Sequence, residues 1–388
     1  MSAGGGLTVL LCSDGSVVVC GDNGFAPCIV PPLTEGLAYV QAAVGYGHVV
    51  LLRSDGAAIG CGWDLYEQCS SLPALKDGLT YVQVSAGDGH TVLLRSDGVA
   101  VSCGLDAHAS GPRTPPALSK GVTYVQASAG RGHTVLLRSD GSAVACGKNS
   151  SGACDVPNLD PGLTYVHVSA GYDHTVLLRS DGSAVACGSN LHGECTLPDL
   201  EEGVTYVHVC AGYSHTLLLR SDGSAISCGD NRDGQCTVPV LEEGMKYVQV
   251  SAGGSHTVLL RSDGSAVACG RNAEGQCNLP VLPPGCSYVQ GCPPQPDRVF
   301  QLSFLSTQPE DLHAVCHNMA GEEVIRLDVR PSDSAFEVRW RLEMQLCAEG
   351  SHGGRLCFVS PAGGLLSEAA SASTVADLLG ESPEPPCP

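Results

Sequence analysis

The chain has 388 residues, of which 49 are Gly and 5% are aromatic, and its formal net charge is -20 from 40 acidic and 20 basic side chains. Such an acidic surface repels phosphate groups, so we expect no direct nucleic-acid binding and no docking on membranes. No segment approaches the ~20 apolar residues of a membrane span, and the start lacks the basic residues of a secretory signal. The expectation is a cytoplasmic or nuclear protein.

One sequence pattern recurs along most of the chain. Its clearest copy, from Tyr165 to Gly188, ends in the hairpin signal Ser-Asp-Gly followed by Ser-Ala-Val-Ala-Cys-Gly. The aspartate of this signal marks seven copies, at Asp14, Asp55, Asp97, Asp140, Asp181, Asp222 and Asp263. A regular repeat of this length indicates an array of identical supersecondary units.

Each unit is expected to consist of β-strands. Val-Leu-Leu before the Ser-Asp-Gly turn and Ala-Val-Ala after it are short apolar runs without helical periodicity. Asp and Gly favour the tight turn between them. Tyr-Val-Gln-Val supplies a further strand, and Gly234–Pro239 suggests a short fourth one. Four strands in a unit of this size predict one blade of a β-propeller.

The array begins and ends inside a unit. Ser2–Gly4 matches Ser251–Gly253, and the last unit stops after Tyr288-Val289-Gln290. We therefore predict an all-β fold over residues 1–290, a seven-bladed propeller that is closed by pairing of its N- and C-terminal strands. Such closure leaves no free sheet edge.

The elements Ala-Gly-x-x-His-Thr, Ser-Asp-Gly, Cys-Gly-x-Asn and Gly-Gln-Cys resemble the repeat of the regulator of chromosome condensation family, from about Ser2 to Gln290. The chain departs from that family in its shorter units, in Cys where Trp is common, and in Leu7 at the histidine position. The resemblance implies a propeller that binds proteins, with guanine nucleotide exchange on a small GTPase as an alternative. No unit carries an insertion long enough for the wedge that exchange factors of this family use.

The repeated polar residues are expected to be structural. Equivalent positions in different blades lie around a ring, so these side chains cannot gather into a metal or catalytic site. Each histidine is expected to bond to nearby backbone of its own blade. The histidines are His48, His90, His133, His174, His215 and His256, and the turn aspartates beyond the first are Asp55, Asp97, Asp140, Asp181, Asp222 and Asp263. We expect no metal and no cofactor.

Cysteines recur in pairs with one eight-residue spacing. The pairs are Cys20/Cys28, Cys61/Cys69, Cys146/Cys154, Cys187/Cys195, Cys228/Cys236 and Cys269/Cys277. Packed thiols, one disulfide per blade and a row of metal sites are the three alternatives. Packed thiols are favoured because Cys103 has Gly111 in its partner position and no signal directs the chain to an oxidising compartment.

Catalytic motifs are missing from the sequence, and the Ser, His and Asp residues recur as copies, so we expect no enzyme. Function should lie where the blades differ, in the two residues after Ala-Gly and in the loop after Cys-Gly. Tyr, Trp and Arg at such positions are typical anchors of protein interfaces. The candidate partner-binding residues are Tyr46, Trp63, Tyr66, Asp88, Arg131, Tyr172, Tyr213, Arg232 and Arg271.

The character of the sequence changes beyond residue 290. Residues 291–312 are expected to form a Pro-containing linker, although Val299–Leu305 suggests a strand. A hairpin near Ala314–Val329, a helix that starts at Ser334 with a capping box, and a strand at Arg355–Val359 then resemble a ubiquitin-like β-grasp domain over residues 313–380. Residues 381–388 are expected to be a disordered tail.

Together these features predict a non-enzymatic scaffold for protein–protein interactions, with a link to the ubiquitin pathway implied by the C-terminal resemblance. Its partners would be proteins, such as a small GTPase or a ubiquitin-pathway protein. Two alternatives remain open: an exchange factor for a small GTPase, and the substrate-recognition component of a ubiquitin ligase.

Overall fold

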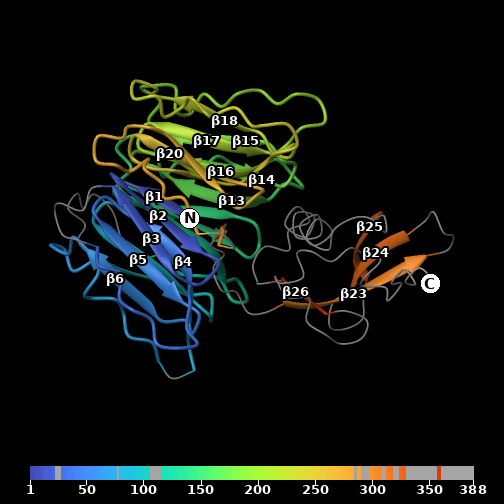
Figure 1. Cartoon of the computed structure of the whole chain (residues 1–388), viewed down its shortest axis with the longest axis horizontal. Coiled ribbons are helices and arrows are strands. Elements are labelled where there is room, and N and C mark those ends of the chain that lie inside the picture. Colours follow the sequence, from blue (N-terminus) through green and yellow to red (C-terminus); the bar gives the residue numbers. More distant parts are fainter. Residues whose placement is uncertain are drawn as a thin grey trace, which may run out of the picture. The chain divides into compact units, whose positions relative to one another are not determined.

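The computed structural model describes residues 1–21, 28–76, 78–104, 115–283 and 286–289, and the backbone of four further strands between 298 and 359. The chain divides into two compact units, Met1–Pro294 and Gln295–Pro388, which are considered separately below (Figure 1). Every regular element in the described ranges is a β-strand. Those ranges include no helix with the length and apolarity needed to cross a membrane.

In the first unit, blades 2 to 7 are antiparallel sheets of three strands. The strands nearest the axis are β4 (Tyr39–Val44), β7 (Tyr81–Ala86), β10 (Tyr124–Ala129), β13 (Tyr165–Ala170), β16 (Tyr206–Ala211) and β19 (Tyr247–Ala252). The middle strands are β5 (His48–Arg53), β8 (His90–Arg95), β11 (His133–Arg138), β14 (His174–Arg179), β17 (His215–Arg220) and β20 (His256–Arg261). The outer strands are β6 (Ala58–Gly62), β9 (Ala100–Gly104), β12 (Ala143–Gly147), β15 (Ala184–Gly188), β18 (Ala225–Gly229) and β21 (Ala266–Gly270).

Blade 1 is assembled from both ends of the unit. It contains β1 (Ser2–Gly4), β2 (Leu7–Cys12), β3 (Val17–Gly21) and β22 (Tyr288–Val289). Strands β1 and β22 both pair with β2, so together they occupy the place of the single inner strand of the other blades. The Tyr288 hydroxyl donates to Pro280 O at 2.6 Å, as Tyr206 does to Pro198 O in blade 6.

The apolar core lies between the blades. Each of seven clusters of buried side chains joins one blade to the next, and one of them joins blade 7 to blade 1 through Val258, Leu10 and Tyr288. The middle strands carry most of this burial because both of their faces are covered, as in β14, where the four residues after His174 are buried. Val and Leu fill these positions throughout, which compensates for the low aromatic content.

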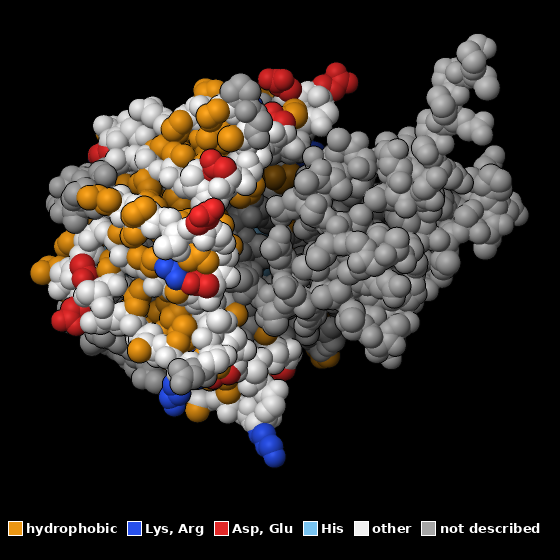
Figure 2. Space-filling view, turned by 60° about the horizontal axis from the view of Figure 1, so that its bottom comes forward, with side chains coloured by type: hydrophobic (Ala, Val, Ile, Leu, Met, Phe, Trp, Pro, Cys, Tyr) orange, Lys and Arg blue, Asp and Glu red, His pale blue; other side chains and the backbone are white. Residues whose placement is uncertain are grey.

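Apolar side chains also reach the surface of the propeller. Figure 2 shows them as clusters between polar and acidic side chains on one face. Among the described residues, Val281 is 98% exposed and Val240 is 91% exposed. Both follow a proline in the loop that leads to the next blade.

The fourth strand expected in each blade is wrong where the structure describes the loop after the outer strand. Gly234–Pro239 forms a turn rather than a strand. The Asn231 side chain accepts a hydrogen bond from the Cys236 amide at 2.9 Å, and Gly234 takes a φ of 84°, which an L side chain rarely adopts. This local bonding satisfies the backbone without a neighbouring strand.

The repeat histidines are structural, but they bond across the blade boundary instead of to their own backbone. His174 Nε2 lies 3.1 Å from Thr216 Oγ1 of the next blade. The Thr216 hydroxyl donates to Glu194 O at 2.7 Å, so its oxygen is left to accept the His174 proton. The same His–Thr contact joins His48 to Thr91, His90 to Thr134, His133 to Thr175, His215 to Thr257 and His256 to Thr8.

The cysteines do not pair as their eight-residue spacing suggests. The described residues contain one disulfide, between Cys28 of blade 1 and Cys61 of blade 2. Side chains alternate between the two faces of a strand, so a strand cysteine points away from the loop of its own blade. Packed thiols, the favoured alternative, describe most of the other cysteines in these ranges.

In the second unit the structure describes β23 (Arg298–Ser306), β24 (Leu312–His317), β25 (Glu323–Asp328) and β26 (Leu356–Val359), in the sheet order β25-β24-β23-β26. The predicted hairpin corresponds to β24 and β25. The prediction of a linker is wrong for Arg298–Ser306, where the sequence also suggested a strand. This segment is β23, which pairs with both β24 and β26 in this sheet. The predicted helix and tail lie outside the described residues, and nothing supports the β-grasp assignment or its link to ubiquitin.

Candidate functional site

The turns between inner and middle strands form a hydrogen-bonded ring around the propeller axis. In blades 2 to 7 the second residue of each turn donates its backbone N–H to a turn carbonyl of the next blade. Examples are Tyr46 N to Gly87 O at 3.3 Å and Arg131 N to Gly171 O at 3.2 Å. The residues that hold this position are Gly5, Tyr46, Asp88, Arg131, Tyr172, Tyr213 and Gly254. Five of these residues carry side chains, and all five line one cavity at the end of the channel that these turns form.

Two neighbouring members of this ring cannot carry a side chain. A Cβ on Gly5 would lie 2.0 Å from Tyr46 O, and a Cβ on Gly254 would lie 2.5 Å from Gly5 O. Blades 7 and 1 thus leave their part of the channel end open. Tyr213 of blade 6 extends past this gap, and its hydroxyl reaches Asp88 Oδ1 of blade 3 at 3.2 Å.

An aromatic cluster surrounds Tyr213. Tyr46 stacks on it with ring centroids 6.4 Å apart and planes at 6°, and Tyr172 lies 4.8 Å away. Trp63, from the loop after β6, meets Tyr46 edge-on at 6.2 Å and Tyr66 at 5.2 Å. The rings thus form a row in which each contacts the next, from Tyr172 through Tyr213, Tyr46 and Trp63 to Tyr66.

Charged side chains complete the site. The Arg131 guanidinium carbon lies 4.2 Å from the centre of the Tyr172 ring, which is a cation–π geometry. Arg131 also lies 3.9 Å from Asp88 and 3.8 Å from Asp173. Lys148 Nζ approaches Asp173 Oδ1 at 3.1 Å. Two acids and two bases thus form a chain of contacts through blades 3, 4 and 5.

The environment of the site changes the ionisation of Asp88 and Tyr213. Burial raises the pKa of Asp88 to about 6, although the Tyr213 hydroxyl and Arg131 act in the opposite direction. Burial, and next the Asp88 charge, raises the pKa of Tyr213, so this hydroxyl stays protonated as a donor.

These side chains enclose a cavity of about 480 Å³. Its wall includes the ring residues and aromatic side chains, and it continues outward between blades 3 and 4 past His90, His133, Cys103 and Cys146. Such a volume accommodates one or two side chains of a partner. In the described residues no three His, Cys, Asp or Glu side chains are arranged to hold a metal ion.

Seven of the nine candidate partner-binding residues line this cavity, namely Tyr46, Trp63, Tyr66, Asp88, Arg131, Tyr172 and Tyr213. Arg232 and Arg271 do not. Arg232 pairs with Asp230 at 2.7 Å, and Arg271 pairs with Glu274 at 2.5 Å, in exposed outer loops. Sequence reasoning missed Asp173, although it is the second residue of the variable pair that begins with Tyr172. Lys148 lies in the loop after Cys-Gly, where function was expected, but it was not among the nine candidates.

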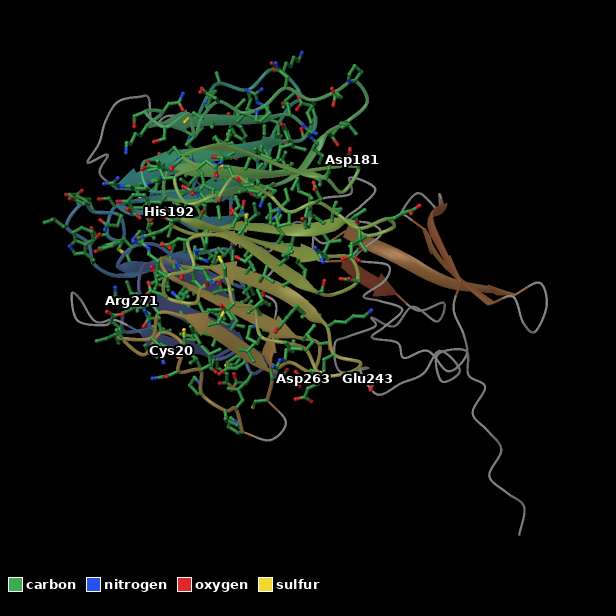
Figure 3. The ribbon with its side chains drawn as sticks, turned by 90° about the horizontal axis from the view of Figure 1, so that it is seen from above. Cys20, Asp181, His192, Glu243, Asp263 and Arg271 are labelled. Carbon is green, nitrogen blue, oxygen red and sulfur yellow. A yellow bond between two sulfur atoms is a disulfide. The ribbon has the colours of Figure 1, made fainter. Side chains whose placement is uncertain are left out.

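The two ends of the propeller differ in chemistry. Figure 3 shows His192, Arg271 and Cys20 at one end, and Asp181, Asp263 and Glu243 at the other. The loops after the outer strands, including Trp63, belong to the first end, because Trp63 N bonds Gly47 O in the axial turn. The opposite end presents the repeated Ser-Asp-Gly turns, which vary little between blades. The cavity end is therefore the end where the blades differ.

Comparison with known proteins supports the repeat assignment. Five segments match the regulator of chromosome condensation (RCC1) repeat, at residues 81–109, 124–153, 165–194, 206–235 and 247–276. No curated protein matches the chain.

Solved structures share the fold at low sequence identity. The structure of Prp20p from Saccharomyces cerevisiae, described with its binding to Gsp1p and histones, has a TM-score of 0.58 and 20% identity, and the match covers 72% of this chain and 84% of that one. The structure of yeast RCC1 (Prp20) bound to Kap60 has a TM-score of 0.54 and 21% identity, and the match covers 63% of this chain and 72% of that one. The CRINKLY WD40 ectodomain of the Arabidopsis thaliana receptor kinase ACR4 has a TM-score of 0.53 and 20% identity, and the match covers 71% of this chain and 98% of that one.

The matched repeats lie in blades 3 to 7, and blades 1 and 2 show the same order of inner, middle and outer strands. Five matched repeats in an all-β array of such blades support an RCC1-type β-propeller.

Proposed function

We propose that the propeller is a non-enzymatic protein-interaction module that anchors its partner in the cavity at the channel end. The observation that carries this proposal is convergence: residues that depart from the repeat in five consecutive blades meet around one cavity. Unselected variation would scatter over seven blades and both ends. Clustered Tyr, Trp and Arg residues are the usual source of binding energy in protein interfaces.

The charges favour a partner segment that carries a basic side chain. The chain has a net charge of -20, which attracts basic partners over a distance. Within the cavity, Asp88 holds Arg131 only at 3.9 Å, so a partner's ammonium or guanidinium group can compete for this carboxylate. The rings of Tyr46 and Trp63 offer it a neighbouring aromatic face.

The experiment compares partner recovery by the full chain and by Tyr213→Ala, with quantitative mass spectrometry of the copurified proteins. Glu243→Ala, at the opposite end, is the matched control. A true partner is reduced at least tenfold by Tyr213→Ala and unchanged by Glu243→Ala. Equal recovery by both variants, with unchanged melting temperatures, rejects the cavity as the binding site.

Binding and exchange on a small GTPase is the second candidate. The RCC1 repeats and the fold shared with Prp20p, which is described as binding Gsp1p, support it. One observation opposes exchange activity: the loops in the described ranges have nearly the same length in every blade. None of them is long enough to form the wedge that exchange factors of this family use. Release of labelled nucleotide from a panel of small GTPases tests it, and no acceleration by the full chain removes this candidate.

We further propose that the pairing of β22 with β2 closes a stable seven-bladed ring. Two residue pairs, Leu11 with Val289 and Cys12 with Tyr288, support this proposal, as does the apolar cluster between blades 7 and 1. A closed ring keeps the cavity rigid because its residues come from blades that are joined on both sides. A cytoplasmic or nuclear location remains a prediction.

A further inference from the structure

The propeller carries a belt of cysteines that crosses every blade. One member, the strand cysteine, is the penultimate residue of each outer strand: Cys20, Cys61, Cys103, Cys146, Cys187, Cys228 and Cys269. The other, the loop cysteine, follows in the turn: Cys28, Cys69, Cys154, Cys195, Cys236 and Cys277. Neither the repeat assignment nor the proposed partner binding explains why so many cysteines recur.

Within one blade the two cysteines lie on opposite faces of the outer strand. The loop cysteine packs beside the residue that precedes the strand cysteine. A Cβ on Gly60 would lie 2.6 Å from the Cys69 Cα, and Ser227 Oγ lies 3.1 Å from Cys236 Sγ. Because neighbouring side chains in a strand alternate, Cys61 and Cys228 project from the other face.

The strand cysteine instead faces the loop cysteine of the preceding blade. Cys103 Sγ lies 3.6 Å from Gln68 O, the carbonyl next to Cys69. Cys187 Sγ lies 3.7 Å from Ala153 O, next to Cys154. The same contact places Cys228 at Glu194 O and Cys269 at Gln235 O, both at 3.8 Å.

The boundary between blades 1 and 2 shows what this arrangement allows. There the loop cysteine Cys28 and the strand cysteine Cys61 form a disulfide. The boundary between blades 7 and 1 has the same arrangement, with Gly21 next to Cys20 and Gln276 next to Cys277. A Cβ added to Gly21 would lie 3.0 Å from the Gln276 Cβ. The relation between neighbouring blades is thus repeated around the ring.

We propose that the belt is a set of interblade disulfide sites, in which each loop cysteine bridges the strand cysteine of the following blade. Besides Cys28–Cys61, the bridges are Cys69–Cys103, Cys154–Cys187, Cys195–Cys228, Cys236–Cys269 and Cys277–Cys20. Gly111 occupies the loop position of blade 3, so the boundary between blades 3 and 4 has no such bridge.

The oxidant is a low-molecular-weight disulfide such as glutathione disulfide. One protein thiolate attacks it, releases one glutathione thiolate and forms a mixed disulfide. The neighbouring cysteine, after losing its proton, then attacks the protein sulfur of that mixed disulfide and releases the second glutathione. Each bridge therefore removes two protein protons and passes two electrons to the oxidant.

These thiols react slowly in the folded protein. Burial, reinforced by neighbouring groups, raises the pKa of Cys69, Cys187, Cys228 and Cys269 to about 12, so little thiolate forms at neutral pH. Bridging is expected during long exposure to oxidant, and faster at higher pH. It would fix adjacent blades to one another.

The test treats the full chain with glutathione disulfide, blocks remaining thiols with an alkylating reagent, and maps linked peptides by mass spectrometry. The expected peptides join neighbouring blades in the pairs named above. Peptides that join the two cysteines of one blade, such as Cys187 with Cys195, overturn the proposal. The oxidation is continued until the amount of glutathione bound to the protein no longer changes. If every cysteine of the belt can still be alkylated at that point, the proposal is also overturned.

One substitution separates the two pairing schemes. Cys195→Ser should leave Cys228 open to alkylation, while Cys187 stays protected in its bridge to Cys154. Pairing within blades would instead expose Cys187 and protect Cys228, which overturns the proposal. Cys286→Ser, outside the belt, is the matched control and should change neither cysteine.

Discussion

Leu7 of blade 1 and Val49 of blade 2 belong to one buried apolar cluster, in the two positions that the other six blade boundaries fill with histidine and threonine. Blade 1 lacks the histidine, and blade 2 lacks the threonine that this histidine would have bonded. Losing both leaves no buried donor or acceptor unsatisfied, whereas losing one would. The His–Thr contact is thus a unit that can be replaced only as a whole.

This relation predicts strong coupling between His174 and Thr216. Thr216→Val leaves the His174 Nε2–H buried without its acceptor and should cost about 1–3 kcal/mol of unfolding free energy. The double variant His174→Leu/Thr216→Val should be more stable than the sum of the single losses by at least about 0.5 kcal/mol. Urea unfolding measures all four proteins, and simple additivity would contradict the assignment.

Stability should fall as the solution is acidified. Burial lowers the pKa of His48, His133 and His215 to about 3, and of His174 and His256 to about 4, from 6.5. Below pH 6.5 the unfolded chain takes up protons that the folded chain refuses, so folding loses about 1.4 kcal/mol per pH unit for each such histidine.

The loss should extend from about pH 6.5 to about pH 4 for His174 and His256 and to about pH 3 for the other three, and it should be absent above pH 7. Thermal unfolding across this range measures it. His174→Leu/Thr216→Val removes one of these groups and should flatten the dependence, and an unchanged slope would count against buried neutral histidines.

Partner binding should depend on Asp88 and on pH. Because the pKa of Asp88 is about 6, its carboxylate is charged at pH 7 and largely neutral at pH 5. A basic partner should therefore bind more tightly at pH 7, and Asp88→Asn should weaken it and remove most of the difference between the two pH values. Titration of wild type and variant at both values tests this, with Asp181→Asn at the opposite end as control.

The pairing of β22 can be tested with two equivalent tyrosines. Tyr288 in blade 1 is 5% exposed and Tyr206 in blade 6 is 3% exposed, and each bonds a proline carbonyl. If β22 closes the ring, Tyr288→Ala should destabilise the first unit as much as Tyr206→Ala, by about 3–5 kcal/mol. A loss below about 1 kcal/mol for Tyr288→Ala alone would show that the terminal strand adds little.

The repeat determined most of what sequence could predict about the fold. The Ser-Asp-Gly turns located the hairpins, and the split between Ser2 and Gln290 anticipated that both ends contribute to blade 1. The fourth strand failed because the bond from Asn231 to the Cys236 amide is local and resembles no strand pattern. The place of β23 was missed because the sequence does not show which strands pair at long range.

The site was predicted from variation, and its geometry was not. Tyr46, Trp63 and Tyr213 were found because they break the repeat, but only the ring brings them within contact distance across blades 2 and 6. The pairing of histidine with threonine did leave a signal: Leu7 precedes Thr8, whereas His48 precedes Val49. Reading each residue against the following blade would have revealed it.

The two axial glycines have a consequence for stoichiometry. Seven similar blades would offer a ligand seven equivalent orientations, but Gly5 and Gly254 remove the side chains from one sector, while Tyr213 reaches across to Asp88 of blade 3. The rotational equivalence of the blades is thereby broken at the channel end alone. One propeller should accordingly accept a single partner molecule, in one fixed orientation.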